Sequence, residues 1–283
     1  MLARADMKFP EIRDEKGQPA QLSEGRYRTY IMSPDRNVRR EAFEKLFATY
    51  SQYRNTFAAT LGGTVKKNIF YAGVRNYDSA IAAALESDNV PVAVYNRLVD
   101  TVNENLAPLH RYVALKKKAL KLTEMHMYDL YTPLVPDAHI KMNYSEAQTL
   151  VQQGLHPLGA EYGKILDQAL SSRWVDIYEN QGKQSGAYSW GVYGVHPFVL
   201  LNFNHRLEDA MTLAHELGHS LHSYYSNSTQ PYATHDYTIF SAEVASTTNE
   251  TLLLDHLLKT TTDPKKKMYL LNEYLETIRT TVF

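Results

Sequence analysis

The sequence contains no cysteine, and this absence narrows both the environment and the chemistry of the chain. Without cysteine there is no disulfide framework, and there are no thiolate ligands for a metal ion. Nothing in the composition therefore points to an oxidising compartment. The interpretation that the composition favours is a cytoplasmic protein.

A strong net charge and long apolar runs are also lacking. The formal net charge of −1 gives no electrostatic reason to expect nucleic acid or an anionic membrane as a partner. No stretch approaches the length that a membrane span requires, and Met1 to Glu11 lacks the apolar core of a secretory signal peptide. The 283 residues are 44% hydrophobic, so they can bury a substantial core as one large domain or two closely associated ones.

What the sequence does contain is an H-E-x-x-H motif, formed by His215, Glu216 and His219. On a helix, positions four residues apart lie one turn apart and only about 40° apart around the axis, so both imidazoles share one face. Asn204 is the expected N-cap. The residues around the motif predict such a helix because their apolar members fall on the other side as a buried stripe: Leu207, Ala210, Met211, Ala214, Leu217 and Leu221.

Two imidazoles one turn apart are a natural chelate for one borderline metal ion such as zinc, which then needs a third protein ligand. The candidate is Glu243, which lies 24 positions after His219. The polar segment from Asn227 to Asp236 would let a second helix, roughly Thr238 to Lys259, fold back against the first. Glu250 follows Glu243 by two helical turns, so it could hydrogen-bond a histidine ligand and orient it.

Two further residues of the first helix bear on the site. Glycine in a helix interior is less favourable than alanine by about 1 kcal/mol. At Gly218 the absence of a side chain would let the second helix approach closely, and the packing gained would offset this loss of helix stability. His222 shares the histidine face and competes for the third ligand position, although a role in the wall of the site or as a partner of a ligand is favoured. A metzincin would need glycine and histidine where this chain has His222 and Tyr225, so that class is excluded.

Several segments closely resemble the oligoendopeptidase F branch of the thimet oligopeptidase family. The likeness extends more weakly over most of the chain. The segments that carry it are His215 to Ser226, Thr229 to Tyr232, Ala242 to Thr247, Gly186 to Ser189 and Pro197 to Phe203.

This resemblance implies a zinc-dependent endopeptidase that hydrolyses internal bonds of short peptides rather than folded proteins. It makes His215, His219 and Glu243 the ligands of one zinc ion, and Glu216 the catalytic base. It also implies a mostly helical fold that closes over a deep channel.

The expected fold class is mainly α, a zincin-like helical peptidase domain with a small antiparallel β-sheet beside the active-site helix. By resemblance, Gly186, Ala187 and Tyr188 would hold an extended peptide substrate through main-chain hydrogen bonds, with a purely structural hairpin as the alternative. The strands of the sheet are expected within Trp174 to Tyr178, Gly186 to Trp190 and Phe198 to Phe203.

Residues 1–283 are interpreted as a single catalytic region, with a mostly helical scaffold in 1–142 and the zinc-site half in 143–283. Within the scaffold, Met7 to Ile12 and Arg26 to Met32 are expected to be short strands. A helix capped by Ser33 is expected to run to about Val74, with a possible break at Gly62 and Gly63.

Family members are considerably longer than this chain, so the resemblance predicts a chain truncated at both ends. It would lack C-terminal residues that bind substrate in the family. The alternative function is therefore a zinc-binding, catalytically silent fragment that binds peptides. The 24-residue spacing argues against the thermolysin type, but carboxypeptidase relatives share a similar spacing. Spacing alone leaves endopeptidase and carboxypeptidase action open, and the oligomeric state is not indicated.

Overall fold

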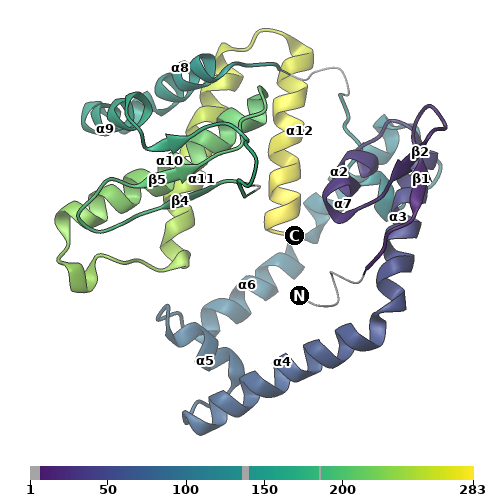
Figure 1. The fold of residues 1–283 in the computed structure, drawn as a ribbon, viewed down its shortest axis with the longest axis horizontal. Coiled ribbons are helices and arrows are strands. Elements are labelled where there is room, and N and C mark those ends of the chain that lie inside the picture. Colours follow the sequence, from purple (N-terminus) through teal and green to yellow (C-terminus); the bar gives the residue numbers. More distant parts are fainter. Residues whose placement is uncertain (1–6, 136–139, 185) are drawn as a thin grey trace. The chain divides into compact units, whose positions relative to one another are not determined.

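The computed structural model of the chain describes residues 7–135, 140–184 and 186–283, and its fold is drawn in Figure 1. The described residues are mostly helical with two small sheets, which confirms the predicted fold class. The chain divides into two compact units, one of Met1–Pro136 with Leu275–Phe283 and the other of Asp137–Tyr274. None of the helices in the described ranges has the length and apolarity needed to cross a bilayer.

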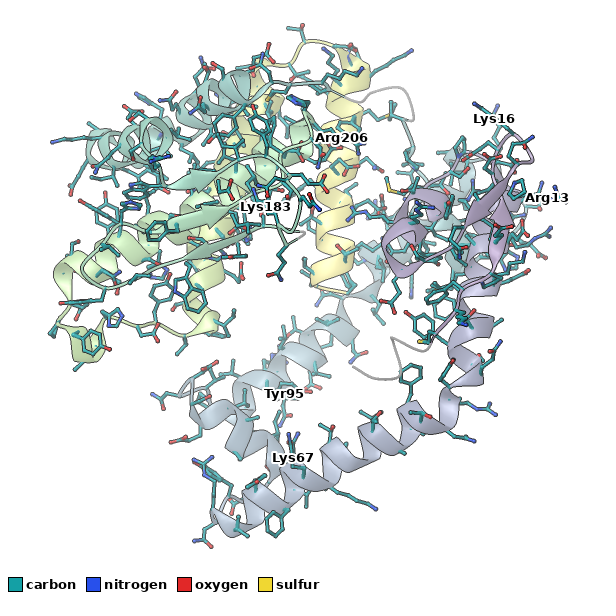
Figure 2. The ribbon with its side chains drawn as sticks, viewed as in Figure 1. Arg13, Lys16, Lys67, Tyr95, Lys183 and Arg206 are labelled. Atoms are coloured by element: carbon teal, nitrogen blue, oxygen red, sulfur yellow. The ribbon has the colours of Figure 1, made fainter. Side chains whose placement is uncertain are left out.

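The first unit combines a β-hairpin with a series of helices. Its elements are β1 (Glu11–Arg13), β2 (Pro19–Gln21), α2 (Glu24–Ile31), α3 (Arg36–Gln52), α4 (Arg54–Val74), α5 (Ala80–Glu86), α6 (Val92–Glu104), α7 (Leu106–Ala119) and the 3₁₀ turn η1 (Met127–Asp129). The hairpin packs against α3 around a core that includes Ile12, Leu22 and Leu46. In contrast, α4 and α6 carry mostly exposed side chains, among them Lys67 and Tyr95 (Figure 2).

A buried carboxylate joins η1 to α3 in this unit. Asp129 is fully buried, and its side chain accepts hydrogen bonds from Arg39 at 2.9 Å and from Arg36 at 3.0 Å. Burial alone would raise the pKa of Asp129, but the two guanidinium groups outweigh it and hold the pKa below its ordinary value. The carboxylate is therefore charged and paired in the folded chain.

The second unit surrounds the predicted zinc-site helix. Its elements are α8 (Tyr144–Leu155), η2 (His156–Leu158), α9 (Ala160–Ser171), β3 (Val175–Asp176), β4 (Tyr188–Trp190), β5 (Phe198–Leu200), α10 (Leu207–Thr229), η3 (Tyr232–Thr234), α11 (Ile239–Thr260) and the first part of α12 (Pro264–Thr281). Helix α10 packs against α8, α9 and α11 and against strands β4 and β5, so it forms the centre of this unit. The return helix was predicted as roughly Thr238 to Lys259, and α11 confirms it.

The small sheet beside α10 is mixed, which corrects the prediction of an antiparallel sheet. The strand order is β3-β5-β4, with β4 antiparallel to β5 but β3 parallel to it. Although β5 comes last of the three in the chain, it lies between β3 and β4. Its direction then matches β3 and opposes β4. Strand β4 is left at an edge of the sheet.

Two expectations for the scaffold were wrong. The segment predicted as a strand from Arg26 to Met32 forms most of α2, because the Ser23 side chain caps a helix by accepting a hydrogen bond from the Arg26 amide. The long helix does not break at its adjacent glycines. It breaks at Tyr53 between α3 and α4, and Gly62 and Gly63 lie inside α4.

Candidate metal centre

Helix α10 carries the H-E-x-x-H motif, and its start differs from the prediction. The helix begins at Leu207 with Arg206 as the N-cap, rather than with Asn204. His205 has a φ of 62°, which turns the chain before the helix begins. The Asp209 carboxylate accepts hydrogen bonds from the amides of Asn204 at 2.7 Å and Arg206 at 2.9 Å. A first-turn carboxylate therefore satisfies the exposed amides at the positive end of the helix dipole.

The apolar stripe predicted for α10 is largely observed. Leu207, Ala210, Ala214, Leu217 and Leu221 are buried, whereas Met211 is only partly buried. Because the helix is surrounded on several sides, Leu213 is also fully buried although it lies outside the predicted stripe. Burial on these sides fixes the rotation of α10 and turns the histidine face toward α11.

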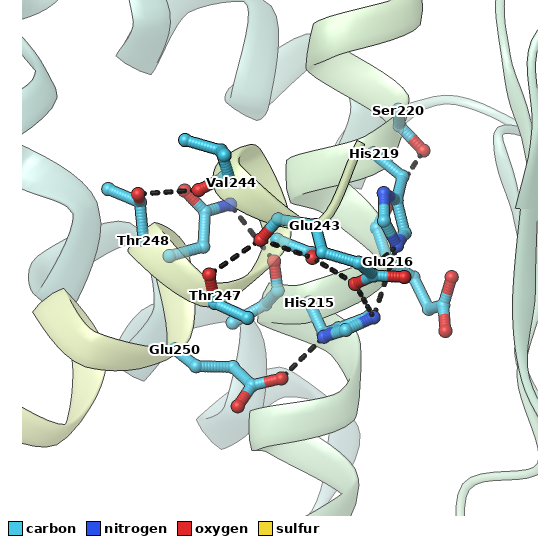
Figure 3. A network of polar contacts seen from close by, with 12 residues as sticks. His215, Glu216, His219, Ser220, Glu243, Val244, Thr247, Thr248 and Glu250 are labelled. Atoms are coloured by element: carbon cyan, nitrogen blue, oxygen red, sulfur yellow. Dashed lines mark hydrogen bonds and ion pairs between the residues drawn. The ribbon is translucent and has the colours of Figure 1, made fainter. Parts of the chain in front are cut away.

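His215, His219 and Glu243 converge at one point between α10 and α11 (Figure 3). The Nε2 atoms of the two histidines lie 3.1 Å apart, and Glu243 Oε2 lies 3.6 Å from each of them. Within the described ranges, this is the one group of three or more histidine, aspartate or glutamate residues whose ligand atoms all lie within 4.8 Å of one another. Two imidazole nitrogens and one carboxylate oxygen are a ligand set used by catalytic zinc sites, so the residues fit a zinc ion.

Each histidine also has a hydrogen-bond partner on α11. His215 Nδ1 is in hydrogen-bond contact with the Glu250 carboxylate, and the backbone of Ala242 hydrogen-bonds His219. Burial disfavours the charged form of His215, but the Glu250 carboxylate outweighs it and raises the pKa of His215. For His219, burial and the neighbouring His215 together lower the pKa. With Nδ1 engaged on Glu250, a neutral His215 presents the lone pair of Nε2 to the convergence point.

Glu243 is itself held from within α11. The Ser246 hydroxyl donates to Glu243 Oε2 over 2.7 Å, which leaves the carboxylate aimed at the histidines. This partner was missed by the sequence analysis. Its signal was a small hydroxyl residue three positions after a proposed ligand, since positions i and i+3 are neighbours on a helix.

The close approach of α10 and α11 depends on Gly218, as predicted. A Cβ atom at this position would lie 2.7 Å from the Cα of Ser246 and 2.9 Å from the carbonyl oxygen of Ala245. No side chain fits between backbones this close. The bare backbone of Gly218 therefore brings α11 near enough for Glu243 to reach the histidines.

Glu216 lies on the same helix but is not one of the three converging residues. It is only 6% exposed, and burial raises the pKa of its carboxyl group, while the neighbouring His215 opposes that effect. The backbone of Ser189 in β4 forms a hydrogen bond with the Glu216 carboxylate. A buried carboxylate with a raised pKa, beside a histidine cluster, has the character of a proton acceptor.

His222 lies one turn beyond His219 and outside the converging group. Its ring stacks on Tyr237 with centroids 3.8 Å apart, and burial lowers the pKa of His222. The Tyr237 hydroxyl is 2.6 Å from the Ser223 hydroxyl and 3.5 Å from the His219 carbonyl oxygen. His222 and Tyr237 together form a stacked pair beside His219.

The residues predicted to hold a peptide substrate lie at and before edge strand β4. Tyr188 opens the strand and is 44% exposed, whereas Ala187 is partly buried. Gly186 has a φ of 93°, and its carbonyl oxygen accepts a hydrogen bond from Asn202 at 2.8 Å. Because the next residue of the strand, Ser189, hydrogen-bonds Glu216, this edge runs beside the candidate centre.

Residues 29–283 match the model of peptidase family M3. Oligopeptidase PepF of Bacillus subtilis is 51% identical over 283 residues, which is all of this chain and 42% of the relative. The chromosomal oligoendopeptidase F of Lactococcus lactis is 45% identical over 279 residues, which is 99% of this chain and 46% of the relative.

Solved structures show the same similarity. A crystal structure from Chlamydophila abortus matches with a TM-score of 0.88 at 40% identity, over 99% of this chain and 47% of the other. The crystal structure of oligoendopeptidase F from Enterococcus faecium matches with a TM-score of 0.73 at 39% identity, over 99% of this chain and 43% of the other. The chain thus spans less than half of the length of each of these four proteins.

Proposed function

The chain belongs to peptidase family M3, as its resemblance to oligoendopeptidase F predicted, and from this we propose that it carries the zinc centre of a metallo-oligopeptidase. The proposed reaction is zinc-dependent hydrolysis of internal peptide bonds in short oligopeptides. The observation that supports it best is the convergence of His215, His219 and Glu243 beside the buried Glu216.

In this proposal one zinc ion per chain is held by His215, His219 and Glu243. Glu250 orients His215 through Nδ1, and the backbone of Ala242 hydrogen-bonds His219. When bound, zinc supplies Lewis acidity, which polarises a peptide carbonyl and lowers the pKa of water to about 7. Fixing three ligands on two helices in advance removes the need to order them when the metal binds.

Glu216 is the proposed general base. Its carboxylate accepts a proton from the attacking water and then passes that proton to the leaving amine nitrogen, so that the amine departs neutral. The raised pKa of Glu216 suits both steps, because the carboxyl group must take up a proton and give it away at similar pH. The hydrogen bond from Ser189 keeps the carboxylate near the sheet edge where a peptide would lie.

The substrate is proposed to lie along β4. An extended peptide can add to a sheet edge through main-chain hydrogen bonds, which recognise the backbone rather than particular side chains. Gly186, Ala187 and Tyr188 are the proposed contacts. His222 is proposed to line the site beside the zinc ligands without ligating the metal.

Three wider assignments are part of this proposal. Residues 143–283 form the zinc-site half and residues 1–142 a scaffold for it, within one catalytic region. The partners are short peptides. A cytoplasmic location is proposed from the cysteine-free composition alone.

Zinc stoichiometry combined with mapped cleavage products tests the proposal. The 283-residue chain is incubated with a quenched fluorescent peptide, with and without a metal chelator, and the products are identified by mass spectrometry. Internal cleavage that stops with chelator and returns with one equivalent of zinc supports the endopeptidase. A chain that binds one zinc and the peptide but leaves the peptide intact is the silent, peptide-binding fragment.

A further inference from the structure

Asn249 is an unusual residue for its position in α11. It is 1% exposed and lies on the inward face of the helix, where its neighbours are small or apolar. Burying an amide costs free energy unless its polar atoms are hydrogen-bonded, and a leucine would fill a similar volume without that cost. The hydrogen bonds of the buried amide should therefore explain why an asparagine occupies this position.

The Asn249 amide connects three helices. Its Nδ2 donates to the carbonyl oxygen of Ala214 in α10 over 2.9 Å. The hydroxyl of Tyr162 in α9 faces the other edge of the amide, 2.9 Å from Nδ2 and 3.0 Å from Oδ1. A carbonyl oxygen can only accept, so the Ala214 contact fixes which way the amide points. Burial raises the pKa of Tyr162 to about 12, so its hydroxyl stays protonated at neutral pH and can donate to Oδ1.

These contacts lie next to the zinc-site contacts on both helices. Ala214 directly precedes His215, and Asn249 directly precedes Glu250, so two successive residues of α11 bind two successive residues of α10. Glu243 lies six residues before Asn249 on α11, which is about 9 Å along the helix axis. The Asn249 contact therefore fixes the position of α11 along the axis of α10. This in turn fixes where Glu243 lies along that axis relative to the two histidines.

We propose that Asn249, braced by Tyr162, is a positioning residue that sets the register of α11 on α10 and so places Glu243 for metal binding. The inference rests on the proposed function, in which Glu243, His215 and His219 hold zinc. Hydrophobic packing between two helices tolerates small slides, whereas a hydrogen bond to one chosen carbonyl does not. A buried polar contact of this kind specifies one arrangement among several that pack almost equally well.

Asn249→Leu and Tyr162→Phe test the inference in the full chain. Zinc affinity is measured by competition with a chromogenic chelator on protein shown to be folded by circular dichroism. Asn249→Leu is expected to lower zinc affinity about 10-fold, a size typical for partners behind a metal ligand. Tyr162→Phe should change it in the same direction by less, and the double variant should match Asn249→Leu alone, because the hydroxyl acts only through the amide.

The visible absorption of bound Co²⁺ gives a second reading, since it reports the geometry of the ligands and not the stability of the fold. It is expected to change in Asn249→Leu and to stay unchanged in Tyr144→Phe, a matched tyrosine whose ring packs edge-on against Phe203 in the same unit. If Asn249→Leu does not fold, Tyr162→Phe decides the question alone.

Wild-type affinity and an unchanged Co²⁺ spectrum in a folded variant would overturn the inference while leaving the proposed function intact. A wild-type chain that binds no zinc would instead overturn the proposed function, and the inference with it. The two failures are therefore distinguishable in one set of titrations.

Discussion

Glu243 Oε2 stands 3.6 Å from the Nε2 atoms of both His215 and His219, although Glu243 lies 24 positions after the nearer histidine in the chain. Two antiparallel helices bring about this meeting. The backbone contact at Gly218 sets their spacing, and the pairs Ala214–Asn249 and His215–Glu250 set their register.

Replacing Glu243 by alanine should cause loss of bound zinc. Two imidazoles alone leave the metal with one protein ligand fewer than a catalytic zinc site uses. Metal content after gel filtration, measured by mass spectrometry, provides the test, with Glu161→Ala on α9 as a control glutamate in the same unit. Unchanged metal content in Glu243→Ala would mean that another residue is the third ligand.

Glu216→Gln should abolish peptide hydrolysis and leave zinc bound. The amide keeps the size of the side chain but cannot accept a proton, and loss of a general base typically lowers the rate by about 10²–10⁴-fold. Initial rates with a quenched fluorescent peptide, measured at equal zinc content, provide the comparison. Hydrolysis at the wild-type rate would remove Glu216 from the mechanism.

Gly218→Ala should destabilise the chain by pushing α11 away from α10. The new Cβ would lie 2.7 Å from backbone of α11, and such overpacking costs about 1–3 kcal/mol. Gly163→Ala on α9 is the matched control, since nothing lies within 4 Å of a Cβ there. The control should be neutral or stabilising by up to about 1 kcal/mol from helix propensity alone. Urea unfolding measures the unfolding free energy of both variants. Equal unfolding free energies would show that α11 can move away from the new methyl group without loss of stability.

Asp129→Asn should destabilise the first unit in a pH-dependent manner. Removing the charge leaves the buried Arg39 guanidinium without its anion, which costs about 3–5 kcal/mol at neutral pH. Because folding lowers the pKa of Asp129, the stability it contributes is fully present above the unfolded value of about 3.9. That contribution is lost as the pH falls through the folded pKa.

The difference in unfolding free energy between wild type and Asp129→Asn should therefore shrink as the pH drops below about 4. Urea titrations across this range measure it. Asp255→Asn, which removes an exposed ion pair with Lys259, should change stability by no more than about 1 kcal/mol at any pH. A difference for Asp129→Asn that stays constant into strong acid would contradict the assigned role of the ion pair.

Much of this site could be predicted because its signals are local. The four-residue spacing of His215 and His219, the apolar stripe of α10 and the glycine at 218 all follow from helix geometry. The return of α11 was predicted from a polar, proline-containing segment. Local signals were enough because the two helices are consecutive in the chain.

What could not be predicted depended on partners that are distant or on competition between local signals. The direction in which β3 pairs with β5 depends on strand order, which no periodicity encodes. Arg26 to Met32 was predicted to be a strand, yet the cap at Ser23 makes it a helix. The hydrogen bond between Tyr162 and Asn249 joins residues 87 positions apart. It depends on how α9 packs in the folded second unit, which the sequence does not indicate.

The pairing of neighbouring residues across α10 and α11 has a consequence for insertions and deletions. One extra residue inside α11 between Glu243 and Asn249 would turn the Glu243 carboxylate by about 100° relative to Glu250, so that the two carboxylates could no longer both reach the histidines. An insertion in the connecting segment from Gln230 to Thr238 would not change the rotation of Glu243 relative to Glu250. Length variation among homologous chains should accordingly fall in this connection and spare the helical stretch that follows it.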